Sequence, residues 1–220
     1  MSLQQALDAF KANFQGGGPP YYAPPWIHEI LHRATDELVA SGAASRALKA
    51  GAFMPDFELL DVYGTKVASG ALLAAGPLVI SFYLGLWCPY CSLELQALEA
   101  SLGEIQRRGA NLVAISPQTR ASSHRAVREN KLSFPILLDP HNTVAAEFGL
   151  RVKLPDHLID VYKNVFKADL AMTNADGSCT LPMPARFVVC QDGAVIYTEV
   201  NPDYTHRRDP RECLAALDTA

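Results

Sequence analysis

Two cysteines three positions apart are the residues of this sequence best suited to covalent chemistry. The segment WCPYC places Cys88 and Cys91 directly after the apolar run PLVISFYL, which has the length and β-branching of a buried strand. From Cys91 onward apolar residues recur at helical spacing, so we expect Cys88 to stand where a helix begins. Unpaired N–H groups and the helix dipole stabilise a thiolate there. The spacing therefore predicts a nucleophilic, low-pKa Cys88 and a resolving Cys91.

Other interpretations of the CxxC pair are half of a zinc site and two inert buried thiols. The chain has five cysteines, but Cys179 and Cys190 are separated by ten residues, so no second pair at zinc-knuckle spacing exists. An odd number of cysteines also disfavours a framework of structural disulfides. Redox chemistry is the favoured interpretation, with Trp87 as an apolar wall of the site and with no metal and no cofactor.

A second motif that could do chemistry is His28-Glu29-Ile30-Leu31-His32, a literal HExxH. On a helix this pattern sets two imidazoles one turn apart for zinc, with a glutamate as the base. The motif stands in the N-terminal part of the chain, and no glycine-bearing continuation follows it. We therefore treat a zinc metallopeptidase through His28, Glu29 and His32 as an unfavoured alternative and predict no functional zinc.

The elements around the cysteines follow an α/β pattern. Two helices, over residues 2–14 and from Pro25 towards Leu48, form an N-terminal helical extension over residues 1–50. Residues 51–220 form the main domain, in which buried strands alternate with amphipathic helices, as in LVISF, NLVAIS and FPILLD. This alternation predicts a central, mostly parallel sheet flanked by helices. Residues 152–182 are expected to be an inserted loop-helix piece, and ARFVV and AVIYTEV a hairpin.

Four segments in order, GAFMPDFELLDVYG, SFYLGLWCPYC, LVAISPQT and LSFPILLDPHNTVAAEFGL, resemble successive motifs of the alkyl hydroperoxide reductase and thiol-specific antioxidant (AhpC/TSA) family. The similarity is to its peroxiredoxin-like branch with CPYC and spans roughly residues 50–218. The resemblance implies a thioredoxin-like fold of the peroxiredoxin type and reduction of a small peroxide or a disulfide. It also implies that Cys88 corresponds to the peroxidatic cysteine, that a thioredoxin- or glutathione-type thiol restores it, and that the chain can form a homodimer.

The sequence departs from the family where a peroxide would be held. Ser81 and Gly85 stand at the places of the proline and threonine in Pro-x-x-x-Thr-x-x-Cys. Pro184 is placed like the proline that faces the cysteines in thioredoxins, where typical peroxiredoxins carry an arginine. Arg186, two residues further, returns to the same face of a strand, so we expect it to supply a replacement cation near Cys88.

Composition limits the possible partners. The hydrophobic fraction is 49%, the net charge is −4, and no long basic run is present, so neither nucleic acid nor a membrane surface is expected as a partner. The N-terminal segment lacks the apolar core of a secretory signal, which predicts a cytoplasmic protein. The predicted function is a peroxiredoxin-like thiol oxidoreductase. A thioredoxin-like disulfide reductase without peroxidase activity and a redox-regulated binding protein remain open.

Overall fold

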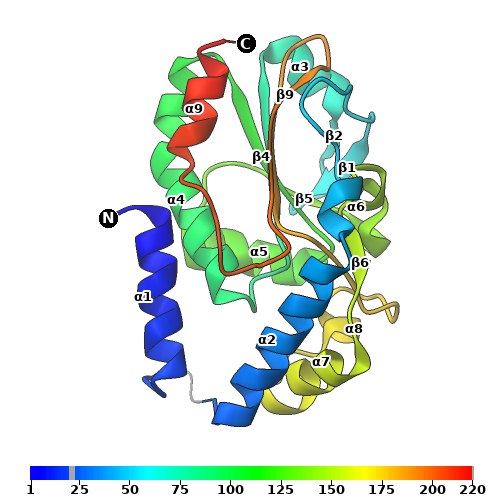
Figure 1. The fold of residues 1–220 in the computed structure, drawn as a ribbon. Coiled ribbons are helices and arrows are strands. Elements are labelled where there is room, and N and C mark those ends of the chain that lie inside the picture. Colours follow the sequence, from blue (N-terminus) through cyan, green and yellow to red (C-terminus); the bar gives the residue numbers. More distant parts are fainter. Residues whose placement is uncertain (20–22, 220) are drawn as a thin grey trace.

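The computed structural model describes residues 1–19 and 23–219, and Figure 1 shows its helices arranged around a central sheet. Residues 20–22, between the two predicted N-terminal helices, lie outside the described part. The larger helices are α1 (Leu3–Gln15), α2 (Pro25–Ala40), α4 (Pro89–Arg107), α5 (Arg120–Asn130) and α9 (Arg211–Leu217). Shorter ones are the 3₁₀ turns η1 (Ala43–Arg46) and η2 (Pro140–Asn142) and the helices α3 (Ser69–Ala75) and α6 (Thr143–Glu147).

Seven strands form the central sheet in the order β2-β1-β5-β4-β3-β8-β9. Their bounds are β1 (Glu58–Asp61), β2 (Lys66–Ala68), β3 (Leu78–Phe82), β4 (Asn111–Ser116), β5 (Ile136–Leu138), β8 (Ala185–Val189) and β9 (Val195–Val200). Only β3 with β4 and β4 with β5 pair in parallel, and all other neighbours are antiparallel. The predicted mostly parallel sheet is therefore wrong in this respect. Hairpins close both edges, and a hairpin adds antiparallel strands.

Both faces of the sheet are buried, which explains why its central strands are mostly apolar. In β3 all five residues are buried, and successive side chains point to opposite faces. Leu78, Ile80 and Phe82 belong to the core under α3 and α6, whereas Val79 belongs to the core under α4 and α5. The predicted central sheet flanked by helices is confirmed in this layered structure.

The N-terminal helices pack onto the main core. α1 begins at the predicted Ser2 cap, with Gln5 completing a capping box, and it lies alongside α4 in Figure 1. Leu7 and Ile27, from α1 and α2, are fully buried in the same core cluster as the start of α4. α2 ends at Ala40, earlier than the pattern towards Leu48 predicted, and the chain continues through η1. The extension therefore shares its core with the thiol site.

The insertion predicted over residues 152–182 contains more regular structure than a loop with a helix. It holds α7 (Asp156–Asp160), a π-helical turn η3 (Val161–Val165) and α8 (Leu170–Thr173) between the paired strands β6 (Arg151–Lys153) and β7 (Thr180–Pro182). Tyr162 and Phe166, from this insertion, reach the core next to α4. Long-range packing, rather than local pattern, orders this segment.

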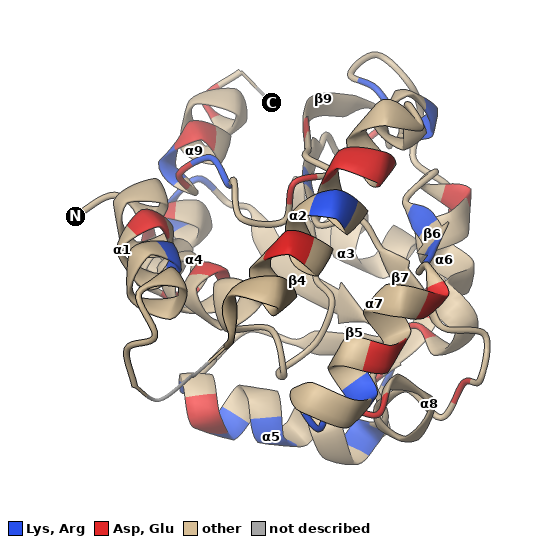
Figure 2. Ribbon diagram, turned by 60° about the horizontal axis from the view of Figure 1, so that its bottom comes forward, with Lys and Arg blue, Asp and Glu red and all other residues tan. Residues whose placement is uncertain are grey.

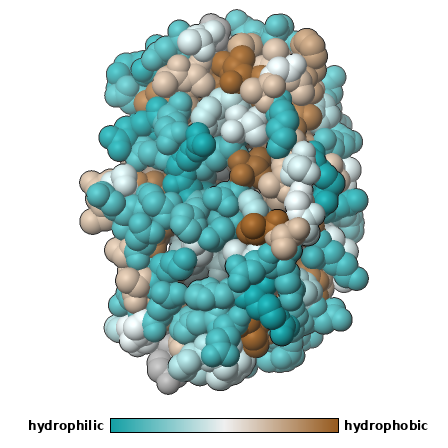
Figure 3. All heavy atoms as spheres, viewed as in Figure 1, coloured by the Kyte–Doolittle hydropathy of each residue, from teal (hydrophilic) through white to brown (hydrophobic). Residues whose placement is uncertain are grey.

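Charges of both signs are scattered over the described elements in Figure 2, and α5 carries acidic and basic residues on one helix. The face seen in Figure 3 is largely hydrophilic, with small separate hydrophobic patches. No helix within residues 1–19 and 23–219 is long and apolar enough to cross a membrane.

Candidate functional site

Cys88 stands at the N-terminus of α4, as the sequence predicted. It is the N-cap residue, with extended backbone angles, and Pro89 follows as the first helical residue. β3 ends earlier than expected, at Phe82, and the turn from Tyr83 to Trp87 carries the chain from the strand to the helix. Cys88 is only 3% exposed and Cys91 is not exposed, and both are free thiols.

The two thiols are joined by a hydrogen bond. Donation from Cys88 to Cys91 raises the pKa of Cys88 well above its ordinary value, and burial raises it further. Burial also works to raise the pKa of Cys91, but the hydrogen bond from Cys88, the charge of Arg207 and a hydrogen bond from the Leu84 backbone lower it on balance. The two buried thiols therefore ionise as an interacting pair rather than independently.

These pKa directions differ from the sequence prediction. Cys88 was expected to have the lowered pKa because it alone begins the helix, whereas the pKa of Cys88 is raised and that of Cys91 is lowered. The helix terminus is only one of the influences on the pKa of Cys88. A thiol that donates its proton to a neighbouring sulfur is harder to ionise, and this direct contact outweighs the more distant dipole.

An apolar cavity of about 290 Å³ opens onto Cys88. Most of its wall is aromatic, and the lining comes from five parts of the chain: α1, α2, the turn around Cys88, the insertion near η3, and the segment before α9. The lining residues are Phe10, Phe14, Leu31, Leu84, Trp87, Cys88, Pro89, Tyr90, Tyr162, Val165, Phe166 and Tyr204. No charged side chain is among them, and Cys91 is not part of the lining. Cys88 is therefore the sulfur of the pair that meets a molecule in this cavity.

Trp87 lines this cavity, and Gly85 lies against Trp87. The Trp87 ring lies 4.9 Å from the ring of Tyr162, which confirms its place in the apolar wall. Gly85 does not line the cavity. Its φ of 156° and its close approach to Trp87 and Gln118 leave no space for a side chain, because a Cβ would lie 2.6 Å from Trp87 Nε1.

We expect Gly85→Ala to lower the free energy of unfolding by about 1–3 kcal/mol, because the added methyl group collides with two ordered side chains. Gly103→Ala, on an open part of α4, is the matched control and is expected to be neutral or stabilising. Urea unfolding of both variants measures the difference. Equal stability of the two would contradict the role assigned to Gly85.

Pro184 lies beside the cavity rather than in it. The residue precedes β8 and lines a neighbouring cavity of about 460 Å³, together with Met183. The two cavities have Leu31, Leu84, Tyr162 and Tyr204 in common, so Pro184 and Cys88 lie on adjoining parts of one region.

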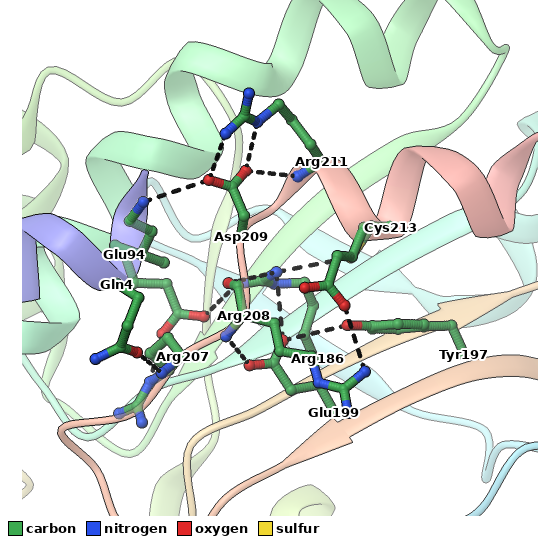
Figure 4. Close-up of polar contacts among 12 residues, drawn as sticks. Gln4, Glu94, Arg186, Tyr197, Glu199, Arg207, Arg208, Asp209, Arg211 and Cys213 are labelled. Atoms are coloured by element: carbon green, nitrogen blue, oxygen red, sulfur yellow. Dashed lines mark hydrogen bonds and ion pairs between the residues drawn. The ribbon is translucent and has the colours of Figure 1, made fainter. Parts of the chain in front are cut away.

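Arg186 does not supply the predicted cation near Cys88. Its side chain is fully buried, and Nη2 donates to Glu94 Oε1 at 2.7 Å. Nη1 lies 3.4 Å from Glu199 Oε2, and the guanidinium also donates to the carbonyl of Arg208. Figure 4 shows this network between α4, β8, β9 and α9. Two buried carboxylates outside the cavity direct the guanidinium away from the role that strand geometry suggested.

Arg207 is the cation whose charge acts on both thiols, and sequence reasoning missed it. It lowers the pKa of Cys91 and opposes the rise at Cys88, and in return the two cysteines raise the pKa of Arg207. Glu94, which binds both Arg207 and Arg186, was missed as well. A signal for Glu94 did exist, since a carboxylate three positions after Cys91 lies on the buried stripe of the helix.

The HExxH residues take separate partners in the structure. His28 Nε2 lies 3.2 Å from the carbonyl of Ala23, and His32 Nε2 lies 3.2 Å from Gln15 Nε2. No group of three or more histidine, cysteine, aspartate or glutamate side chains arranged to hold a metal occurs among the described residues. The absence of functional zinc stays a prediction.

Known proteins resemble this chain in sequence and in fold. A protein of Mycobacterium tuberculosis named as a peroxiredoxin is 31% identical over 122 residues, which cover 56% of this chain and 79% of that protein. The thiol-disulfide oxidoreductase ResA of Halalkalibacterium halodurans is 29% identical over 126 residues, 56% of this chain and 70% of ResA. The crystal structure of peroxidoxin BcpB from Mycobacterium tuberculosis superimposes with a TM-score of 0.62 and 24% identity, covering 78% of this chain and 97% of BcpB.

The matched region contains the elements that build the thiol site. The sequence model of the AhpC/TSA family matches residues 50–198, from the segment before β1 into β9. It therefore includes β3, the cysteine pair and α4, and it leaves out α1, α2 and Arg207. This match confirms the resemblance that the motifs around the thiol pair indicated: the chain belongs to the AhpC/TSA family.

Proposed function

We propose that this chain reduces peroxides with Cys88 as the nucleophile and Cys91 as the resolving thiol. The observation that carries the proposal is the position of Cys88, which lines the cavity while hydrogen-bonded to a buried Cys91 of lowered pKa. A nucleophile needs both access to its substrate and a base to take its proton. Cys88 has the access, and the Cys91 thiolate is the base.

In the first step the Cys88 sulfur attacks one peroxide oxygen while its proton passes to Cys91. The O–O bond breaks, the leaving alkoxide takes a proton to become an alcohol, and Cys88 becomes a sulfenic acid. Cys91 then attacks the Cys88 sulfur, and the departing hydroxide is protonated to water. One peroxide and two thiols thus give one alcohol, one water molecule and one disulfide.

The cavity favours peroxides with an apolar substituent, because its lining is aromatic and aliphatic. Reduction of the disulfide requires an external dithiol or glutathione-type thiol, since the two cysteines have by then given up their electrons. We also propose a cytoplasmic protein, a homodimer, and the division of the chain into an extension over residues 1–50 and a peroxiredoxin domain over residues 51–220.

Rapid mixing of the reduced protein with hydrogen peroxide, with an organic hydroperoxide and with glutathione disulfide tests the proposal. We expect fast loss of two thiols with the hydroperoxide and slow loss with the disulfide. Peptide mapping should then find Cys88 joined to Cys91, with Cys179 and Cys190 still reduced. Rapid reaction with the disulfide alone would favour the disulfide-reductase alternative. If the protein reacted with none of the three oxidants, the alternative of a binding protein without turnover would be favoured.

A further inference from the structure

We propose that Arg207 is the cation of the thiol site, and that α4 through Glu94 and α1 through Gln4 hold it there. The inference rests on the proposed function and adds a role for the N-terminal helix. Gln4 and Arg207 both lie outside the matched family region, residues 50–198. The contribution of Gln4 and Arg207 therefore comes from parts of this chain outside the matched family region.

The first step of the argument is helix geometry. Cys88, Cys91 and Glu94 follow one another at three-residue intervals, so they lie along one face of α4, about one turn apart. All three are almost completely buried. Arg186 and Arg207 both bind Glu94 on that buried face, and one of them acts with its charge on the sulfur pair.

Arg207 is that arginine. Its Nε lies 3.0 Å from Glu94 Oε2, and the two side chains are each 3% exposed. Nη1 donates to the carbonyl of His206 at 2.9 Å, whereas Nη2 is buried and has no hydrogen-bond partner. A buried unpaired N–H donor costs stability, and such exceptions call for an explanation. We infer that an anion on the sulfur pair provides the partner.

Helix α1 fixes the backbone that carries this arginine. The Arg207 N–H donates to Gln4 Oε1 at 2.9 Å, and Gln4 Nε2 donates to the carbonyl of Thr205 at 3.3 Å. The Leu3 N–H donates to Asp209 Oδ2, so the first turn of α1 binds the segment on both sides of Arg207 (Figure 4). Gln4 is thus a positioning residue that acts through Arg207.

Among the charged and titratable groups around the thiols, Arg207 is the cation that acts directly on them. Glu94 on α4 opposes ionisation of Cys91, and Tyr90, Tyr162 and Tyr204 face the pair with raised pKa values and so remain neutral. Asp203 acts on Tyr90 and Tyr204, and Arg186 is occupied by Glu94 and Glu199. The Arg207 charge lowers the pKa of both cysteines.

The test compares Arg207→Met, Arg207→Gln and Arg207→Lys by titrating the thiolate ultraviolet absorbance and by the pH profile of the peroxide reaction. Loss of the charge in the Met and Gln variants should raise the first thiol pKa by about one unit and slow the reaction about tenfold at neutral pH. The rate should recover at alkaline pH, and the Lys variant should keep a near-normal profile. Arg107→Met, an exposed arginine on α4, is the control.

Gln4→Ala tests the role of α1 by the same two measurements, with the exposed Gln15→Ala as its control. We expect a shift in the same direction, about threefold in rate at neutral pH, because Arg207 keeps its charge but loses one anchor. Should Arg207→Met fail to fold, the Gln and Lys variants decide the question, and equal profiles would overturn the proposal. The titration measures the thiol pKa even if no peroxide reacts. A failure of this proposal can therefore be told apart from a failure of the proposed function.

Discussion

Cys88→Ser is expected to lower the rate constant for peroxide reduction by about a thousandfold or more, because a serine hydroxyl is not ionised at neutral pH and cannot attack the O–O bond. Cys91 cannot take over the reaction, since it is completely buried and does not line the cavity. Its lowered pKa makes it a base for Cys88, but a base without access to substrate is not a nucleophile. The variant should therefore keep its thiols when mixed with a hydroperoxide.

Cys91→Ser distinguishes the two roles. Without Cys91, Cys88 loses its base as well as its resolving thiol, so it should react more slowly and stop as a sulfenic acid, visible in mass spectrometry as the addition of one oxygen atom. No intramolecular disulfide should form. Cys190→Ser, in the hairpin between β8 and β9, is the matched control and should behave like the unmodified protein. If Cys88→Ser reacts and Cys91→Ser does not, the roles are exchanged.

The second large effect concerns stability and the buried ion network. We expect Arg186→Met to lower the free energy of unfolding by about 3–5 kcal/mol, because it removes the cation that contacts Glu199 and one of two cations on Glu94. Glu199 is 7% exposed, so water cannot take the place of the guanidinium. Burial already raises the pKa of Glu199, which shows that its charged form depends on Arg186.

Chemical unfolding of three variants measures this effect. Arg125→Met, which breaks an exposed pair with Glu129 on α5, should cost less than about 1 kcal/mol. The double variant Arg186→Met with Glu199→Gln should recover part of the loss, because it removes the carboxylate left without its partner. A loss below about 1 kcal/mol in Arg186→Met would show that the network is not needed for folding.

Local sequence determined the position of the reactive cysteines. The branched apolar run before Trp87 could only be a buried strand, and the helical spacing after Cys91 placed a helix terminus at Cys88. The Ser2 capping box fixed the start of α1 in the same way. These features depend on residues within a few positions of one another, so side-chain periodicity and capping suffice to predict them.

The direction of the sheet strands and the role of Arg186 were decided only in three dimensions. Period-two alternation correctly placed Arg186 on one face of β8, but it cannot tell which groups cover that face. Glu94 and Glu199, which bind the guanidinium, come from a helix and a strand far apart in the sequence. Likewise, the antiparallel pairing of β3 with β8 depends on how the whole chain returns to the sheet.

The electrostatics of the thiol pair are also a property of the tertiary structure. Sequence alone assigned the low pKa to Cys88 from its place at a helix terminus. The fold adds the hydrogen bond between the sulfurs and brings Arg207, more than a hundred residues away, to the same helix face. Coulomb interactions depend on distance in space and on burial, and neither can be read from spacing along the chain when the partners lie on different elements.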